Sequence, residues 1–258
     1  MIQMFRNLYT YRELLKTNVQ KEIRGKYKGA WLGVLWSLLN PILLLIVYSI
    51  IFPHILKIQV PNYTMYLCVA LLPWTCFTAT IQQGTFAVVT NGNIVKKVYF
   101  PREILPISVV TSGMVNFLIT SVVMFAFLIF GGVGLTPYAF FFPIIFLLQY
   151  LIMLAITFIL SAVTVYVRDL EHLVGLTLMV LFYATPIVYT MDSIPANLSW
   201  ILNLNPMTHV ITAYRDILYY QQMPNWGSIA ILFGIALIVF IAGYYIFKKL
   251  ERNFAEEF

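Results

Sequence analysis

The side chains able to do chemistry are few, and they are scattered along the chain. The three histidines fall in different loops and on opposite sides of the expected membrane: His54, His172 and His209. Asp169 and Glu171 form a carboxylate pair, but Arg168 beside them favours an ion-paired loop end. No HExxH, GxSxG or Cys/His metal spacing is present. A membrane enzyme gathers titratable groups at one depth, so its expected parts are missing here.

The motifs of active transport are also missing from this chain. Gly25-Lys26 lacks the upstream glycine of a phosphate-cradling loop. The apolar runs carry no acidic and basic residues at their centres, where a proton-driven carrier would place them. Cys68 and Cys76 lie within one apolar run and indicate small apolar fillers rather than a disulfide or metal pair. If ATP drives transport, the sequence predicts that another polypeptide hydrolyses it.

One charged stretch stands out, and it runs from Ile94 to Pro106 between two long apolar runs. It carries Lys96, Lys97, Arg102 and Glu103, and its prolines, Pro101 and Pro106, fix φ and restrict the residues before them. This pattern predicts a stiff polar connector between two spans that could pair with charges on a partner. The alternative for the two lysines is an anchor to anionic lipid headgroups.

The composition predicts an integral membrane protein, and the long apolar runs described below predict that its fold is all-α. Of 258 residues, 61% are hydrophobic and only 10% are charged, against about 25% charged in soluble domains. The net charge of +6 does not indicate nucleic acid, because the basic residues lie between apolar runs instead of forming one face of a domain.

Six apolar runs are long enough to approach the roughly 20 residues that cross a bilayer. They are Trp31–Phe52, Met65–Val89, Ile107–Phe130, Phe140–Val165, Leu173–Tyr189 and Ile229–Phe247. Prolines interrupt three of them and predict kinks: Pro41, Pro73 and Pro186. The sequence thus predicts a six-span domain over residues 31–258.

The positions of lysine and arginine predict the orientation. With six spans, fourteen of the sixteen fall on the side of the two termini, the 90–106 loop and Arg168, leaving only Lys57 and Arg215 opposite. Cytoplasmic loops carry the excess of basic residues. Both termini and the connector are therefore expected on the cytoplasmic side of the membrane.

Two segments outside the spans are expected to be amphipathic helices. In residues 1–30, apolar side chains recur at helical spacing amid basic ones: Leu8, Tyr11, Leu15, Val19 and Ile23. This helix could lie in the lipid interface or dock on another protein. In residues 190–228, Asn205-Pro206 is a good helix start, and apolar side chains follow it at helical spacing: Met207, Val210, Ile211, Tyr214, Ile217 and Leu218. Two short helices are expected there, at or in the outer leaflet, and such helices usually line or cover a water-filled path.

Four local motifs together resemble the ABC type-2 permeases of polysaccharide exporters, the membrane subunits that export O-antigen, capsular polysaccharide or wall teichoic acid. They are Lys26…Leu32-Gly33…Trp36…Pro41, Phe100-Pro101-Arg102-Glu103…Leu105-Pro106, Arg168-Asp169-Leu170 and Asn205-Pro206. The resemblance runs over nearly the whole chain. The loop containing Phe100 to Glu103 is its most specific element.

The resemblance implies a homodimer that pairs with two copies of a separate ATPase, which would bind ATP and Mg²⁺, since this chain has no cofactor of its own. It also implies a channel at the dimer axis, an undecaprenyl-pyrophosphate-linked glycan as substrate, and an extracytoplasmic gate at residues 190–228. The residues expected to contact the ATPase are Lys97, Phe100, Pro101, Arg102, Glu103, Arg168 and Asp169. Lys26 and Lys28 are candidates to receive the lipid pyrophosphate.

Aromatic residues make up 16% of the chain, and their faces can pack on sugar rings without selecting one linkage. Many of them will instead be lipid-facing or interfacial. The better candidates for the substrate path lie in the first, second and fifth spans, which line the channel in the family: Tyr48, Trp74, Phe77, Phe182, Tyr183 and Tyr189. Alternative functions are a type-2 permease for a drug, haem or lipid, or a membrane enzyme of cell-envelope synthesis.

Overall fold

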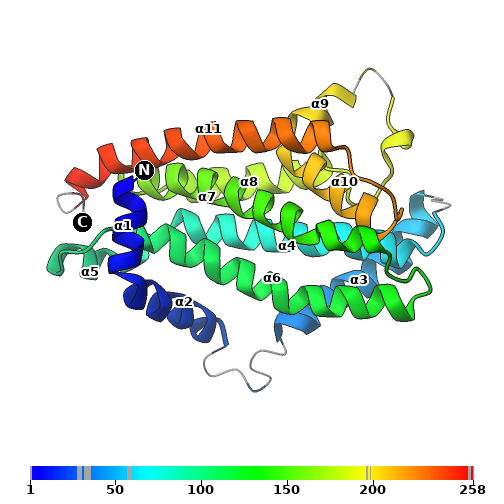
Figure 1. The fold of residues 1–258 in the computed structure, drawn as a ribbon, viewed down its shortest axis with the longest axis horizontal. Helices are drawn as coiled ribbons and strands as arrows, with labels where there is room; N and C mark the ends of the chain where they lie inside the picture. Colours follow the sequence, from blue (N-terminus) through cyan, green and yellow to red (C-terminus); the bar gives the residue numbers. More distant parts are fainter. Residues whose placement is uncertain are drawn as a thin grey trace.

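Five long apolar helices run along one another in the computed structural model, which describes residues 2–27, 31, 36–56, 60–195, 197, 199–254 and 257 (Figure 1). They are α3 (Trp36–Leu56), α4 (Tyr63–Thr85), α6 (Ile104–Phe130), α7 (Phe142–Tyr166) and α11 (Trp226–Leu250). Their 21 to 27 residues suffice to cross roughly 30 Å of hydrocarbon. The described residues form no strand, so the all-α prediction is confirmed.

The predicted fifth run forms a shorter helix than a span requires. Helix α8 covers Leu170–Tyr183, which is 14 residues or about 21 Å at 1.5 Å per residue. The chain leaves the helix at Ala184, just before Thr185 and Pro186. Proline disfavours helical geometry in the residue before it and lacks an N–H donor. The six-span count is therefore not confirmed, because only five of the described helices are long enough to cross.

The other prolines behave differently from Pro186. Pro41 lies inside α3 and Pro73 inside α4, and both helices continue past them. The Gln149 side chain of α7 donates a hydrogen bond to the Pro73 carbonyl at 3.0 Å. A neighbouring helix thus supplies polar contacts beside a helix-interrupting residue, as membrane bundles commonly do.

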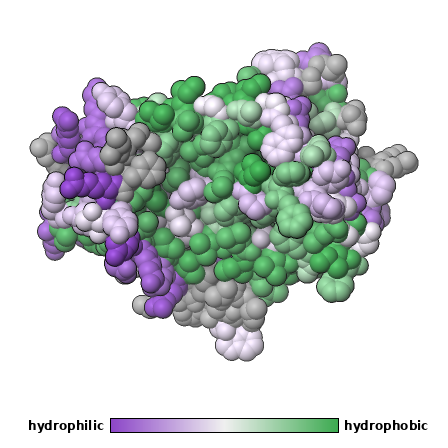
Figure 2. Space-filling view, viewed as in Figure 1, coloured by the Kyte–Doolittle hydropathy of each residue, from purple (hydrophilic) through white to green (hydrophobic). Residues whose placement is uncertain are grey.

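Short elements gather at the two ends of the bundle. Both chain termini, α1 (Ile2–Thr10), α2 (Arg12–Tyr27) and α5 (Gly92–Lys97) lie at one end, and α9 (Ser199–Leu204) and α10 (Pro206–Leu218) lie at the other (Figure 1). We call the first the terminal end. Hydrophilic residues gather there, beside a broad hydrophobic band over the long helices (Figure 2). Four 3-10 turns complete the described elements: Val89–Asn91, Pro137–Phe141, Met191–Ser193 and Glu251–Asn253.

The N-terminal segment forms two helices, α1 and α2, which meet at Tyr11, instead of the single helix that the sequence predicts. Leu8, Tyr11 and Leu15 from its predicted apolar stripe pack against the chain's own core. Helix α2 is further held by a 2.5 Å hydrogen bond from Gln83 to Glu22 and a 3.1 Å bond from Lys21 to Asn91. The apolar stripe therefore contacts the ends of this chain's own helices, while contact with lipid or a partner stays a prediction.

Helix α10 begins as the sequence predicts. The Asn205 side chain accepts a 3.0 Å hydrogen bond from the backbone N–H of Met207, and Pro206 occupies the first turn. The predicted apolar positions are all buried: Met207, Val210, Ile211, Tyr214, Ile217 and Leu218. This helix therefore packs into the body of the protein through the stripe that its sequence predicts.

Candidate translocation groove and terminal-end network

The predicted aromatic residues come together from three helices. Trp74 of α4 lies with its ring centroid 5.6 Å from that of Phe77 and 6.0 Å from that of Phe182 on α8. Phe182 also lies 6.3 Å from Tyr48 of α3 and 5.3 Å from Tyr183. These separations are those of favourable tilted and edge-on aromatic pairs. Residues up to 135 positions apart in sequence thus form one cluster, which we call the aromatic cluster.

The aromatic cluster borders two adjoining cavities between α4 and α8. A cavity of about 290 Å³ is lined by Tyr48, Trp74 and Tyr183, and a second of about 640 Å³ extends towards Glu171 and His172 at the start of α8. Three residues line both and therefore join them: Gln82, Gly175 and Met179. The two cavities define a groove, aromatic at one end and polar at the terminal end.

The polar residues that line this groove were not among the site residues predicted from the sequence. Thr78, Gln82 and Gln83 line the groove from α4. The signal was present, because two adjacent glutamines near the end of an apolar run are unusual for lipid-facing positions. Their amides and hydroxyl can exchange hydrogen bonds with a hydroxylated molecule, while the aromatic cluster offers apolar faces.

Tyr189 lies just beyond the aromatic cluster and ties it to the end opposite the termini. Its hydroxyl donates a 2.8 Å hydrogen bond to the Tyr183 carbonyl, and the Tyr66 hydroxyl donates at 2.8 Å to the Tyr189 carbonyl. Tyr63 donates likewise to the Val188 carbonyl at 2.7 Å. Tyrosines of α4 therefore fix the irregular segment that follows α8.

A buried guanidinium holds the same segment from the other side. Arg215 of α10 is only 3% exposed, and it donates hydrogen bonds to the carbonyls of Pro186 and Ile187, the latter at 2.6 Å. Its Cζ also lies 3.6 Å from the centroid of the Tyr66 ring. Burial lowers the pKa of this arginine, an effect that neighbouring tyrosines partly offset. The sequence predicted that Arg215 lies in an extracytoplasmic segment. In the folded chain its side chain is buried and links α10 to the segment that follows α8.

The connector places its predicted contact residues in different environments. Lys97 and the neighbouring Tyr99 are exposed, Phe100 is buried, and Pro101 and Arg102 are half-buried. Glu103 is 0% exposed, although we expected it to be available to a partner. The exposed part of the connector therefore ends before its acidic residue.

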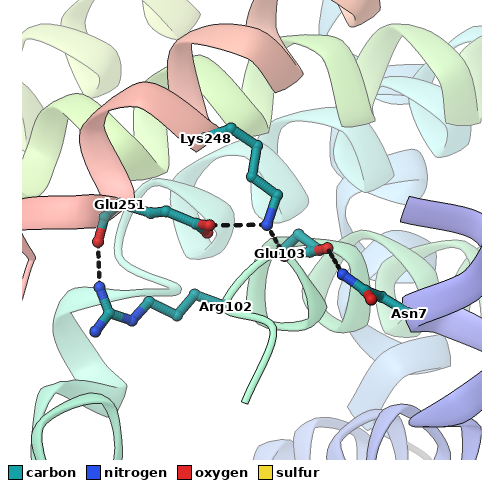
Figure 3. A network of polar contacts seen from close by, with 5 residues as sticks. All are labelled: Asn7, Arg102, Glu103, Lys248 and Glu251. Atoms are coloured by element: carbon teal, nitrogen blue, oxygen red, sulfur yellow. Dashed lines mark hydrogen bonds and ion pairs between the residues drawn. The ribbon is translucent and has the colours of Figure 1, made fainter. Parts of the chain in front are cut away.

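Figure 3 shows why Glu103 is enclosed. Its carboxylate accepts hydrogen bonds from the Asn7 amide of α1 at 2.9 Å and from the Lys248 ammonium of α11 at 2.6 Å. Lys248 also pairs with the Glu251 carboxylate at 2.8 Å, and the Arg102 guanidinium donates to the Glu251 carbonyl. We call these five residues the terminal-end network. It joins α1, the connector and the end of α11.

The other predicted contact residues are exposed or lie outside the described part. Arg168 and Asp169 lie exposed in the turn that leads into α8. Lys26 is within α2, but its side chain is not described, and Lys28 lies outside the described residues. Near the terminal-end network, a cavity of about 370 Å³ is lined by residues such as Gln3, Tyr99 and Arg252.

Five long apolar helices beside a groove with aromatic and amide lining are features of a membrane transport subunit. A family model described as "ABC-2 type transporter" matches residues 13–219. The chain is 35% identical over 258 residues to the "O-antigen export system permease protein RfbA" of Myxococcus xanthus, covering 99% of each chain. It is 36% identical over 256 residues to the protein of the same name from Klebsiella pneumoniae, covering 99% of this chain and 98% of the relative. The chain belongs to the ABC-2 type transporter family.

Proposed function

We propose that the chain is the membrane permease subunit of an ATP-driven exporter that moves a polysaccharide linked to undecaprenyl pyrophosphate, such as O-antigen, across the bacterial inner membrane. Two relatives of nearly equal length are named as O-antigen export permeases, which supports this substrate class. The observation that carries the proposal is the groove between α4 and α8. Its aromatic cluster and amide lining match a polymer whose sugars present apolar ring faces and hydroxyl groups.

A second copy of the chain is proposed to complete the path. Large apolar side chains of α3, such as Ile50, and of α8, such as Met179 and Val180, are between 58% and 65% exposed. These two helices flank the groove, so a homodimer would cover their free faces and enclose the polymer between two grooves. This arrangement gives the substrate contact with protein on both sides.

The terminal end is proposed to face the cytoplasm and a separate ATPase, with two copies per dimer that bind ATP and Mg²⁺. The excess of basic residues in the predicted loops of this side supports the orientation. Lys97, Arg168 and Asp169 are exposed there, and the cavity lined by Gln3, Tyr99 and Arg252 could receive a partner side chain. Lys26 and Lys28 remain candidates to receive the pyrophosphate of the lipid carrier.

Reconstitution tests the proposal directly. The chain is co-expressed with its ABC ATPase, purified as a complex and placed in liposomes with undecaprenyl-pyrophosphate-linked O-polysaccharide. Stimulation of ATP hydrolysis together with movement of the glycan across the bilayer is expected. Stimulation by drugs or simple lipids, without any by the lipid-linked glycan, would contradict the proposed substrate.

Reversing two exposed charges tests the docking surface. The double variant Lys97→Glu with Arg168→Glu should weaken association with the ATPase by about tenfold, or about 1.4 kcal/mol. The reason is that both cations lie at the terminal end, where they can pair with acidic groups of the partner. Binding of the ATPase to detergent-solubilised permease measures the effect. A new carboxylate at exposed Met223, in the Met223→Glu variant, is the control, and equal binding by all forms would remove these two residues from the interface.

Removing an exposed ring of the aromatic cluster tests the path. Tyr183 is 65% exposed, so Tyr183→Ala should leave the fold and the ATPase interface intact while slowing glycan export, by up to about tenfold if one aromatic contact of about 1.4 kcal/mol is lost. The matched control is Tyr245→Ala, because Tyr245 is 70% exposed on α11, away from the groove. Equal export by the two variants would show that Tyr183 does not touch the polymer.

A further inference from the structure

The terminal-end network is balanced in charge within the chain. Its two carboxylates, Glu103 and Glu251, both pair with Lys248, while the Arg102 guanidinium donates to the Glu251 backbone carbonyl and supplies a second positive charge, so the formal charges of the network sum to zero. Arg102 also stacks 5.9 Å above the ring of Phe254, which is fully buried. A self-neutralising network of this kind fits an internal fastening better than a docking site.

Glu103 is the centre of this fastening. It is the last residue before α6, so its backbone moves with the connector, whereas its carboxylate oxygens bind Asn7 of α1 and Lys248 of α11 (Figure 3). A fully buried carboxylate is strongly held by its partners, because separating it from them would leave a charge out of water. Displacing the connector therefore displaces the ends of α1 and α11.

Helix α11 is in turn packed tightly along α7. The ring of Phe158 on α7 contacts those of Phe240, Tyr244 and Phe247 on α11, at centroid distances of 5.8, 5.7 and 5.5 Å. Further along α7, Gln149 accepts a 3.2 Å hydrogen bond from the Tyr214 hydroxyl of α10. A chain of direct contacts thus leads from Glu103 to the helix at the opposite end.

We propose that Glu103 is a positioning residue that fastens the connector to α1 and α11, so that a push on the connector moves the α11–α7 pair and, through it, α10. The inference rests on the proposed function, because the push comes from the partner ATPase. It assigns Glu103 a role inside the permease. Direct contact with the ATPase is assigned instead to exposed residues such as Lys97.

A double-mutant cycle in the reconstituted permease–ATPase complex tests this role. The variants are Glu103→Gln, Lys248→Gln and the two combined, and the measured quantity is glycan exported per ATP hydrolysed. Lys248→Gln leaves the buried carboxylate without its cation and should lower this ratio on the order of tenfold. The combined variant should recover much of the loss, because the fully buried position 103 then carries no unpaired charge and two amides can hydrogen bond there. Glu251, which is partly exposed, loses Lys248 equally in Lys248→Gln and in the combined variant, so it does not affect this comparison. Lys249→Gln is the matched control, since Lys249 is exposed beside Lys248.

The outcomes are separable. Recovery in the combined variant, with the ATPase still bound in all forms, supports the positioning role. Additive losses in the combined variant, an unchanged ratio in every variant, or lower yield of complex with a normal ratio would each overturn it. If wild-type complex shows no export of the lipid-linked glycan while hydrolysing ATP with another substrate, the proposed function fails instead. The ratio for that substrate then still reports on Glu103.

Discussion

Replacing Arg215 by methionine is expected to destabilise the fold by about 4 kcal/mol and to abolish export. The guanidinium donates to the carbonyls of Pro186 and Ile187 and rests on the ring of Tyr66. Removing it leaves buried carbonyls without strong donors, each at a cost of about 1–3 kcal/mol. The irregular segment that carries Tyr189 would then lose its fastening to α10.

The desolvation energy that is recovered when the buried guanidinium is removed opposes this loss of stability, but it is smaller than the cost of the unpaired carbonyls. Burying a guanidinium costs desolvation energy, and apolar replacements of complete buried ion pairs are often tolerated. Here the partners of Arg215 are backbone carbonyls, which remain polar whatever replaces the arginine. Arg215→Lys should not rescue stability, because an ammonium cannot reproduce the fork of donors that reaches adjacent carbonyls.

Thermal unfolding of the purified protein in detergent measures the effect. The melting temperature of Arg215→Met and Arg215→Lys should fall well below that of Thr212→Ala, which alters a half-buried neighbour on the same helix. Near-native melting of Arg215→Met would mean that the segment after α8 is held mainly by the tyrosines of α4. Loss of export at unchanged stability would instead give Arg215 a direct role in transport.

Local sequence patterns predicted those elements whose signals lie within a few residues. Asn205 caps α10 because capping needs only its side chain and the next two residues, and the buried stripe of α10 follows from helical spacing. The grouping of Tyr48, Trp74 and Phe182 was also anticipated, although from a family resemblance rather than from physical pattern. Composition indicated a membrane protein, and the lengths of its apolar runs indicated an all-α fold.

The predictions that differ from the structure concern contacts between distant parts of the chain. Glu103 meets Lys248 across 145 residues, and no periodicity encodes that pairing. The sequence alone does not distinguish an exposed carboxylate from a buried one, so Glu103 was predicted to lie on a surface that contacts a partner. The run ending at Tyr189 was counted as a span by its hydropathy, whereas Pro186 and the carbonyl bonds to Arg215 stop α8 at Tyr183.

The second large effect is expected at Gly243 of α11. A Cβ atom added there would lie 2.9 Å from the Ala155 carbonyl oxygen and 3.0 Å from the Ile159 side chain on α7. Backbone cannot yield as a flexible side chain can, so Gly243→Leu should force α11 away from α7. Overpacking of this kind costs about 3 kcal/mol, and membrane helices rely on small residues for such close approaches.

Helix α11 contains its own control for this substitution. A Cβ at Gly234 meets no atom within 4 Å, so Gly234→Leu introduces the same side chain without a clash. Melting temperature and yield should fall for Gly243→Leu only. Equal behaviour of the two variants would show that α7 and α11 are not tightly seated at this crossing.

The fraction of Gly243→Leu that still folds and assembles with the ATPase tests whether a push on the connector reaches α10 through α11 and α7. The substitution leaves Glu103, Lys248 and the exposed connector residues in place, so the ATPase should still bind. Separating α11 from α7 removes the contact by which α11 is proposed to move α10, and export per ATP should therefore fall even when the amount of complex is equalised. Normal export per ATP in this variant would mean that the push reaches α10 by another route, such as α6 and α4.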